Sequence, residues 1–207
     1  MRLQLTGTKF QPLLLMLLLC CTPAAIAQSK QEIQSRLDKL TLGASNLDEI
    51  KTLFGEPESQ KQLFEWWGGW RDGKFEGMYS AETLEKAKAG IENVTKRTLY
   101  DLNYPKFGLV FSVFDNPWQV HSVTLESSGV TMLGIKVGDP LKKVEMRLGE
   151  GEWSTSDKDD YWWLTYEDKG VRVGFLRELK APKYPMKLDR RKAVLKIERF
   201  DNKVSFT

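Results

Sequence analysis

One pattern of apolar positions occurs twice along the chain. Three apolar residues at helical spacing are followed by Gly-Glu, and the two copies lie 94 residues apart. The copies comprise Leu47, Ile50, Phe54, Gly55 and Glu56, and then Leu141, Val144, Leu148, Gly149 and Glu150. A second pattern, Tyr-x3-Gly followed by an apolar residue, spans 104–109 and recurs 62 residues later at 166–171. The two offsets predict two copies of one unit, and their difference of 32 residues is the extra length of the first copy.

Each copy is predicted to open with a short helix. In the first copy Ser45 is the predicted N-cap, and Gly55 followed by Pro57 ends the helix. In the second copy Asp139 is the predicted N-cap and Pro140 takes the first helical position. The matching signals for the start and the end of the helix in both copies favour a repeated unit over a chance similarity.

Strands are predicted after each helix, because runs of β-branched and aromatic residues alternate with turn residues. The predicted strands are 98–104, 109–114 and 119–125 in the first copy, and 161–166, 171–176 and 193–200 in the second. A helix packed on three to four antiparallel strands is a two-layer unit. We therefore predict an α+β fold of two such units, whose sheets can join edge to edge into one concave sheet.

The domain organisation follows from these elements. Ile33, Leu37 and Leu40 share one helical face, which predicts an N-terminal amphipathic helix from Gln31 to about Lys39, within the segment 28–40. The first unit is assigned to 41–126, with its insertion at about 60–96, and the second to 127–207. The insertion is predicted to include a helix capped by Ser80.

The first 27 residues have the features of a signal peptide. A weakly basic start precedes a short apolar run at 13–19, and Ala25-Ile26-Ala27 fits a signal-peptidase site. The apolar run is too short to span a bilayer. We therefore predict an exported protein, periplasmic or secreted, with no transmembrane segment after signal removal. Cys20 and Cys21 leave a lipid-anchored form as the alternative.

The charge of the chain is close to balanced. The formal net charge is +3, and Arg2 and Lys9 of the predicted signal peptide account for two of these charges. Nucleic-acid binding needs a concentrated basic face, so this balance argues against it. One segment is strongly basic and contains Lys183, Lys187, Arg190 and Arg191. It is either a solvated loop or a contact for anionic lipid, polysaccharide or an acidic partner.

Three tryptophans crowd the predicted insertion. Trp66, Trp67 and Trp70 lie within five residues, separated by Gly68 and Gly69. The two glycines predict a segment without regular structure that another backbone can approach closely. Tryptophans dominate interface hot spots and also stack on sugar rings, so the cluster is a candidate binding anchor. The alternative is that these side chains cover the edge of the sheet or fill a core.

A second aromatic group follows in the other copy. Trp162 and Trp163 are consecutive in a predicted strand, so they must face opposite sides of the sheet. One is expected in the core, and the other on the exposed face beside Tyr161 or Tyr166. Trp118 sits in a predicted turn and is expected to be exposed. Together these side chains predict an aromatic-rich sheet face, and exposed apolar patches of that size mark binding sites.

The sequence contains no complete catalytic constellation. His121 is the single histidine, and both cysteines lie in the predicted signal peptide. The mature chain therefore lacks a disulfide, a thiolate nucleophile and the ligands of a transition-metal site, and we predict neither metal nor cofactor. A carboxylate pair such as Glu65 and Asp72 could hydrolyse a glycoside, but a chain with 28 acidic residues always offers some pair.

Residues 40–57 and 135–150 resemble a known Gly–helix–Leu-Gly-x-Pro segment. It is similar to that of two related groups, the small outer-membrane-assembly lipoproteins and the secreted β-lactamase-inhibitor proteins. The resemblance implies a continuous sheet with helices on one face, a concave exposed face, and a role in binding another protein. No inhibitory contact residue can be transferred to this sequence.

Two functional hypotheses follow. The first is an exported, non-enzymatic protein that binds a protein partner of the envelope or extracellular space through its aromatic sheet face and the tryptophan-rich insertion. The alternative is a module that binds envelope polysaccharide with the same aromatic residues and the basic segment.

Overall fold

Three α-helices and nine strands make up the described part of the chain. The computed structural model describes residues 23–71, 74–79, 92–127, 129–154, 160–176 and 193–200. The helices are α1 (Pro23–Leu37), α2 (Leu47–Phe54) and α4 (Leu141–Leu148), with a 3-10 turn η1 (Glu167–Lys169). The strands are β1 (Ser59–Arg71), β2 (Lys74–Tyr79), β3 (Glu92–Tyr104), β4 (Leu109–Phe114), β5 (Gln119–Leu125), β6 (Glu152–Ser154), β7 (Tyr161–Tyr166), β8 (Val171–Leu176) and β9 (Lys196–Phe200). The predicted signal peptide through residue 22, the predicted helix after Ser80 and the basic residues Lys183, Lys187, Arg190 and Arg191 lie outside the described residues.

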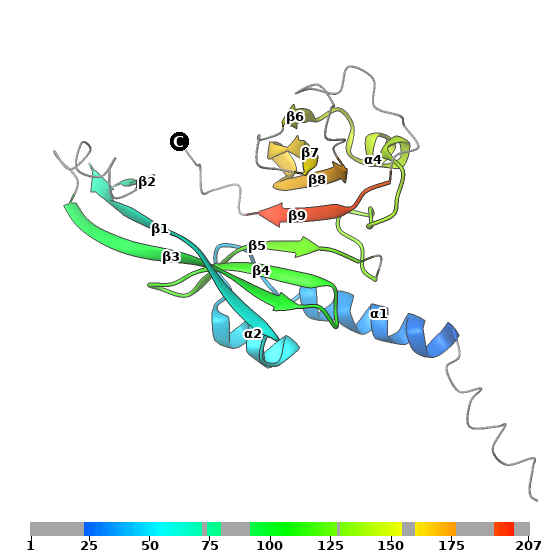
Figure 1. The fold of residues 1–207 in the computed structure, drawn as a ribbon, viewed down its shortest axis with the longest axis horizontal. Coiled ribbons are helices and arrows are strands. Elements are labelled where there is room, and N and C mark those ends of the chain that lie inside the picture. The colour runs from blue at the N-terminus through cyan, green and yellow to red at the C-terminus, as the bar shows by residue number, and fades with distance from the viewer. Residues whose placement is uncertain are drawn as a thin grey trace, which may run out of the picture.

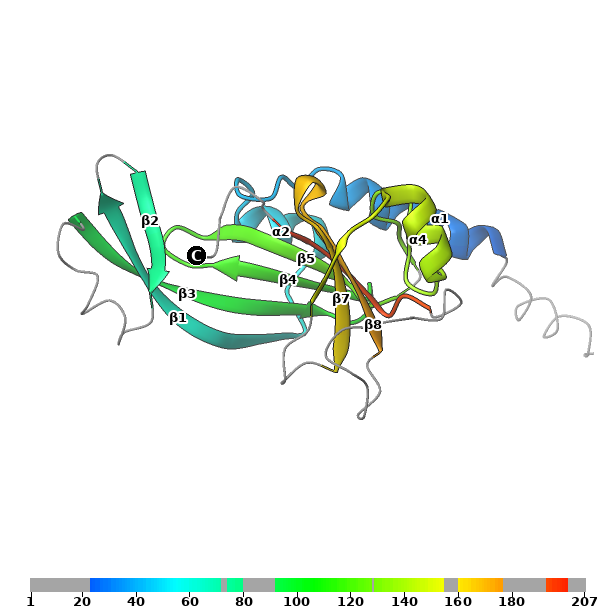
Figure 2. The ribbon, with the colours of Figure 1, turned by 90° about the horizontal axis from the view of Figure 1, so that it is seen from above.

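All nine strands belong to one antiparallel sheet. Their order is β2-β1-β3-β4-β5-β9-β8-β7-β6, so the two halves of the chain meet where β5 pairs with β9. Helices α1, α2 and α4 lie on one face of this sheet (Figure 1, Figure 2). The predicted α+β class and the joining of the strands into one sheet are confirmed.

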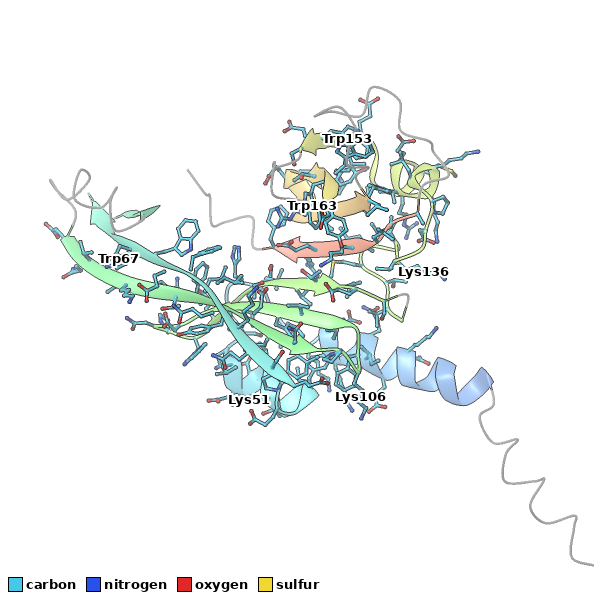
Figure 3. The ribbon with its side chains drawn as sticks, viewed as in Figure 1. Lys51, Trp67, Lys106, Lys136, Trp153 and Trp163 are labelled. Atoms are coloured by element: carbon cyan, nitrogen blue, oxygen red, sulfur yellow. The ribbon has the colours of Figure 1, made fainter. Side chains whose placement is uncertain are left out.

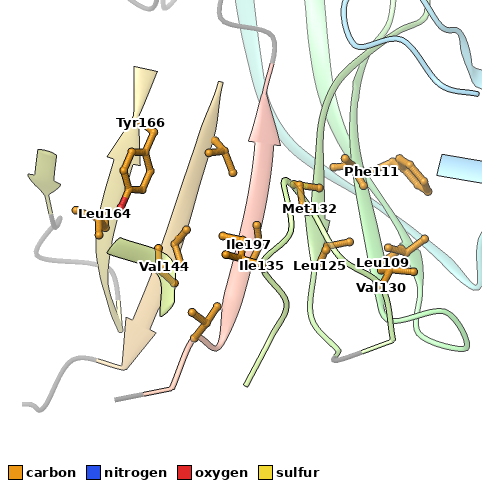
Figure 4. Close-up of a cluster of buried hydrophobic side chains, with 14 of the residues drawn as sticks. Leu109, Phe111, Leu125, Val130, Met132, Ile135, Val144, Leu164, Tyr166 and Ile197 are labelled. Carbon is orange, nitrogen blue, oxygen red and sulfur yellow. The ribbon is translucent and has the colours of Figure 1, made fainter. Parts of the chain in front are cut away.

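The core lies between this sheet and its helices. The strands contribute alternate side chains, because successive residues of a strand point to opposite faces. The fully buried members include Leu102, Phe111, Phe175 and Ile197, and Figure 4 shows the cluster continuing across β5 and β9. The apolar stripes of α2 and α4 complete the core, as the 3.6-residue period predicts.

The N-terminal helix is longer than predicted. It begins at Pro23 instead of Gln31, so it includes the predicted signal-peptidase site at 25–27. Ile33 and Leu37 pack against the core from this helix, in agreement with their predicted shared face. Within the described residues, no helix combines the length and apolarity that crossing a bilayer requires.

Both predicted N-caps are wrong by one residue. The N-cap of α2 is Asn46, whose Oδ1 accepts from the Glu49 backbone N at 3.0 Å, while Ser45 Oγ accepts from the Thr41 backbone N at 3.0 Å. Pro140 is in extended conformation and forms the N-cap of α4. The carboxylate of Asp139 instead accepts from the Lys136 backbone N at 2.9 Å. The side chains of Ser45 and Asp139 therefore stabilise the loop before each helix.

The same hydrogen bonds occur in both halves of the chain. Tyr104 Oη donates to the carbonyl of Gly55 at 3.0 Å, and Tyr166 Oη donates to the carbonyl of Gly149 at 3.2 Å. Each bond ties the end of a strand, β3 or β7, to the glycine that ends the helix of the same half. The residues involved are those related by the offsets of 62 and 94 in the sequence.

A second pair of contacts is similar in the two halves, and its acceptors, Ser45 and Asp139, are related by the offset of 94. The Val120 backbone N donates to the Ser45 carbonyl at 2.8 Å, and the Val194 backbone N donates to the Asp139 carbonyl at 2.9 Å. In the first half, the loop before α2 is thus bonded to strand β5. In the second half, the loop before α4 is bonded to the segment that leads into β9. The internal duplication stays a prediction, which these bonds support.

The tryptophan-rich insertion is regular structure, contrary to the prediction. Gly68 and Gly69 lie within β1, where they are buried and the strand register shifts. β1 has a strand on each side here, and a bulge is a place where glycine is favoured within a strand. Pairing with β2 and β3 therefore overrides the low strand propensity of glycine. We call this projecting part the arm: β1 from Leu63, β2, and β3 up to Thr98.

Candidate functional site

The face of the sheet opposite the helices is hollowed. The hollow has a volume of about 930 Å³ and is lined by side chains from every strand except β2. Its position follows from strand alternation, because the residues between the core positions of each strand must point to this face. The strands of both halves contribute, and the junction of β5 with β9 runs through the lining. We call this site the hollow.

The second half of the chain supplies paired charges to the hollow. Arg172 lies opposite Glu198 in the sheet, with Nη2 at 2.7 Å and Nε at 2.9 Å from Glu198 Oε2. Lys196 Nζ donates to Glu126 Oε1 at 2.5 Å. Burial acts to lower the pKa of Lys196, but the hydrogen bond and charge of Glu126 outweigh it and raise that pKa above its ordinary value. Both cations therefore already have carboxylate partners.

The first half supplies a carboxylate with a different environment. Asp101 on β3 is half-buried, and its Oδ1 accepts from Ser112 Oγ at 2.7 Å. Burial raises the pKa of Asp101, and the charge of Glu198 adds to this effect, while Ser112 and the charges of Lys61 and Lys196 oppose it. These groups lie on strands from both halves. The hollow therefore brings the charges of the two halves within electrostatic reach of each other.

Trp163, and not Trp162, lies on the hollow face. Trp163 is opposite Gly174, and its ring lies 4.5 Å from the Arg172 guanidinium carbon and 5.7 Å from the Tyr161 ring. Trp162 points to the helix side with Leu164. The expectation that one of the pair is exposed is wrong, because Trp162 is 5% exposed and Trp163 8%. Trp163 is covered because Gly174 has no side chain and lets the indole pack onto the sheet (Figure 3).

The arm carries the exposed apolar side chains of the hollow. Leu63 is 36% exposed and Phe64 45%, and the Phe64 ring lies 5.0 Å from that of Trp66. All three line the hollow. Trp67 follows on the other face, where Lys96 Nζ is 5.5 Å from its ring (Figure 3). The side chain of Trp70 lies outside the described residues.

Trp118 is exposed, as predicted, but does not belong to the hollow. It is 36% exposed and its ring lies 5.5 Å from that of Tyr100. Tyr100 packs against the core, so this pair is on the helix side of the sheet. Of the predicted aromatic residues, Trp66 lines the hollow and Tyr161 lies at its edge through contact with Trp163.

The predicted aromatic face is therefore mainly a rim. The middle of the hollow is polar, and sequence analysis did not single out its members Asp101, Arg172, Lys196 and Glu198. A signal was available, since charged residues alternate with core residues along the predicted strands 98–104, 171–176 and 193–200. Alternation identifies such residues as belonging to the second face, but not which of them converge across strands.

The hollow combines exposed apolar side chains on the arm with polar side chains on the neighbouring strands. Within the described residues, no three His, Cys, Asp or Glu side chains are placed to hold a metal ion. His121 lines the hollow, is 7% exposed and lies against Phe114 at 5.2 Å between ring centroids.

Replacing Gly174 by valine is expected to displace Trp163. A Cβ at this position would lie 3.1 Å from Trp163 Cζ3, so the indole must shift away from the sheet. We expect a red-shifted tryptophan emission, stronger acrylamide quenching and a loss of about 1–3 kcal/mol in the free energy of unfolding. Trp163→Phe serves as the control, because the Gly174→Val change should leave the emission unaltered in that background. An unchanged spectrum in the single variant would contradict the packing of Trp163 on Gly174.

Comparison with known proteins finds no family for this chain and only distant structural matches. No protein-family model and no curated protein matches the sequence. The uncharacterized protein yfeY from Escherichia coli is 12% identical with a TM-score of 0.43, covering 77% of this chain and 92% of that one. A DUF4309 family protein, YjgB from Bacillus subtilis, is 10% identical with a TM-score of 0.41, covering 84% and 97%. Similarities this distant leave the function to be argued from the site itself.

Proposed function

We propose that this chain is an exported, non-enzymatic protein that binds a protein partner through the hollow and the arm. The observation that carries the proposal is the group of exposed apolar side chains on the arm, Leu63 and Phe64, next to a polar hollow of about 930 Å³. An apolar anchor beside a polar surface is the composition of protein interfaces. The predicted signal peptide supports export, to the periplasm or the medium.

The dimensions of the exposed surface favour a macromolecule as the ligand. Apolar exposure continues beyond the hollow along the arm, where Val94 is 38% exposed. A small ligand enclosed by the hollow would not reach these side chains. The polar middle fits a partner that offers hydrogen bonds and charges to Arg172, Glu198 and Asp101.

The resemblance to β-lactamase-inhibitor and outer-membrane-assembly proteins enters the same proposal. A duplicated unit with helices on one face leaves the other face of the sheet for a partner. The recurring tyrosine-to-glycine hydrogen bonds support the duplication. The arm is then the feature that one copy has and the other lacks, and binding is assigned to it for that reason.

Envelope polysaccharide is the second candidate, and one specific observation favours it. Aromatic rings at the rim of the hollow, Phe64 and Trp66, stand beside Asp101, Ser112 and Thr124 at its floor. Sugar rings stack on aromatic faces while carboxylates and hydroxyls bond their hydroxyl groups. Tryptophan emission that shifts and saturates with envelope oligosaccharides would favour this candidate over a protein partner.

The test is site-specific photo-crosslinking in the native host. A photo-reactive residue at Leu63 is expected to trap one partner of defined mass, because this side chain is exposed at the mouth of the hollow. Once the partner is identified and purified, Phe64→Ser/Trp66→Ser is expected to weaken its binding about thirtyfold, corresponding to a loss of about 2 kcal/mol.

The matched control uses the opposite side of the molecule. Met146 on α4 is 79% exposed, so a photo-reactive residue there is equally accessible but lies on the helix side. It should not trap the same partner. Identical adducts from both positions, or none from Leu63, would overturn the proposal.

A further inference from the structure

We propose that the hollow receives a lysine or arginine side chain of the protein partner, which pairs with the carboxylate of Asp101 and lies against the ring of Phe64. This inference rests on the proposed function and deepens it by naming the chemistry of the group that enters. Its evidence is the state of the carboxylates in the hollow and the exposed aromatic ring that lines the same hollow.

In the part of the chain that the structure describes, two of the carboxylates that line the hollow are paired with cations, and Asp101 is not. Glu198 is paired with Arg172 and Glu126 with Lys196, as the distances of 2.7 and 2.5 Å show. Asp101 lines the same hollow, yet within the described residues its hydrogen bond comes from the neutral hydroxyl of Ser112 and no ion pair reaches it. A half-buried carboxylate without a cation is stabilised by an incoming positive charge.

The charge of Asp101 is incompletely compensated by the groups around it. Burial raises the pKa of Asp101, which means that its charged form is incompletely compensated by the surrounding protein. Lys61 lies opposite Asp101 in the pairing of β1 with β3, and its charge and that of Lys196 lower the pKa of Asp101, but among the described residues neither lysine forms an ion pair with this carboxylate. An incoming ammonium or guanidinium group would supply the missing compensation at short range.

The exposed ring of Phe64 offers a second contact to a cationic side chain. Phe64 is 45% exposed, lines the hollow with Asp101, and its ring lies 5.0 Å from that of Trp66. A cation over an aromatic face is stabilised by the ring quadrupole, and the apolar stem of lysine or arginine packs on the same surface. The protein already uses this contact, since Arg172 lies 4.5 Å from the ring of Trp163 in the other half.

The experiment measures binding of simple probes to the purified protein by NMR. The probes are acetyl-Gly-Arg-Gly-amide, its lysine form and its citrulline form, which keeps the shape of arginine without the charge. The Trp66 indole N–H, assigned with Trp66→Phe, reports on the hollow. We expect saturable shifts with the arginine and lysine probes and at least tenfold weaker binding of the citrulline probe.

The central variant is Asp101→Asn, which has the same shape and can still accept from Ser112. It is expected to weaken binding of the arginine probe at least tenfold. Asp48→Asn on the exposed surface of α2 is the matched control and should leave binding unchanged. Phe64→Ala is a second variant that removes only an exposed ring, and it is expected to weaken binding severalfold even if the Asp101 variant does not fold.

Several results would overturn this inference. They are equal binding of the arginine and citrulline probes, unchanged binding in both Asp101→Asn and Phe64→Ala, and absence of any saturable shift. Tighter binding of a chitosan hexamer than of the arginine probe would assign the site to an amino sugar instead of a protein side chain. Crosslinking from Leu63 is read independently of the probe titrations, so failure of this inference can be told apart from failure of the proposed function.

Discussion

Replacing Phe111 by alanine is expected to lower the free energy of unfolding by about 3–5 kcal/mol, a large part of the stability of a domain of this size. Phe111 is fully buried and its ring contacts those of Phe54 at 5.2 Å and Tyr104 at 5.6 Å. It therefore joins helix α2 to strands β3 and β4. The cavity left by alanine lies between a helix and a sheet, where the surrounding structure relaxes only partially.

Urea unfolding followed by tryptophan emission and far-UV circular dichroism measures this effect. Phe175→Ala in the other half is the partner variant, because Phe175 is also fully buried and its ring lies 5.7 Å from that of Trp153. Met146→Ala, at a side chain that is 79% exposed, should change the free energy of unfolding by less than about 0.5 kcal/mol.

The shape of these transitions tests whether the halves fold together. β5 and β9 pair through four residue pairs and share one core, so each variant is expected to shift a single transition. Two separate transitions, each moved by only one of the variants, would show that the halves are independent units. The hollow would then lie between two bodies instead of on one continuous sheet.

Sequence periodicity predicted the elements of the core accurately. The strands 109–114, 119–125, 161–166 and 171–176 have the bounds that were predicted, and α2 and α4 carry the predicted apolar stripes. In these segments local propensity, alternation and turn residues agree, and the burial of the same residues reinforces them. The edge-to-edge joining of the two sheets followed from the repeat, since each unit alone leaves an unpaired edge.

The arm could not be predicted in the same way. Its strand β1 contains Gly68 and Gly69, and the pairing of β1 with β3 shifts register twice. The local sequence therefore disfavours a strand here, and the strand forms because β1 pairs with its neighbouring strands. The short β6 was missed for a related reason, because three residues carry no period and are defined by pairing with β7.

The candidate site was predicted less well than the fold. Trp66 lies in it, but Trp162 does not, because the face of a strand residue depends on a one-residue phase that sequence leaves open. The polar middle was missed because its members come from three strands, β3, β8 and β9, and the first of these is distant from the others in the sequence. Asp101 and Glu198 each look like an ordinary exposed residue of a strand until the sheet places them on one face.

The two tyrosines that tie strands to helices predict a specific weakness at high pH. Burial, with a contribution from Glu56, raises the pKa of Tyr104 to about 12, and burial with Glu145 raises that of Tyr166 to about 12. Both side chains are nearly inaccessible, at 3% and 2% exposure, and both hydroxyls donate to glycine carbonyls. Ionisation would remove these donors and leave a charge in the core.

The free energy of unfolding decreases at high pH because the unfolded state loses these protons first. An unfolded tyrosine ionises near pH 10, whereas these two stay neutral in the folded protein to about pH 12. The stabilisation is therefore complete below pH 10 and is lost as the pH rises from 10 to 12. The loss approaches about 1.4 kcal/mol per tyrosine for each pH unit in this window, so the pair can cost up to about 5 kcal/mol.

Tyr104→Phe/Tyr166→Phe separates this effect from the titration of lysines, which both proteins share. At pH 7 the double variant is expected to be about 2 kcal/mol less stable, because it lacks two hydrogen bonds. Since phenylalanine cannot ionise, its stability falls less between pH 10 and 12, and the two curves of unfolding free energy are expected to cross at about pH 11. Curves that stay parallel across this range would refute the proposed role of the two hydroxyls. Equal contributions from the two single variants would indicate that both halves use the same tie, as their hydrogen bonds to Gly55 and Gly149 imply.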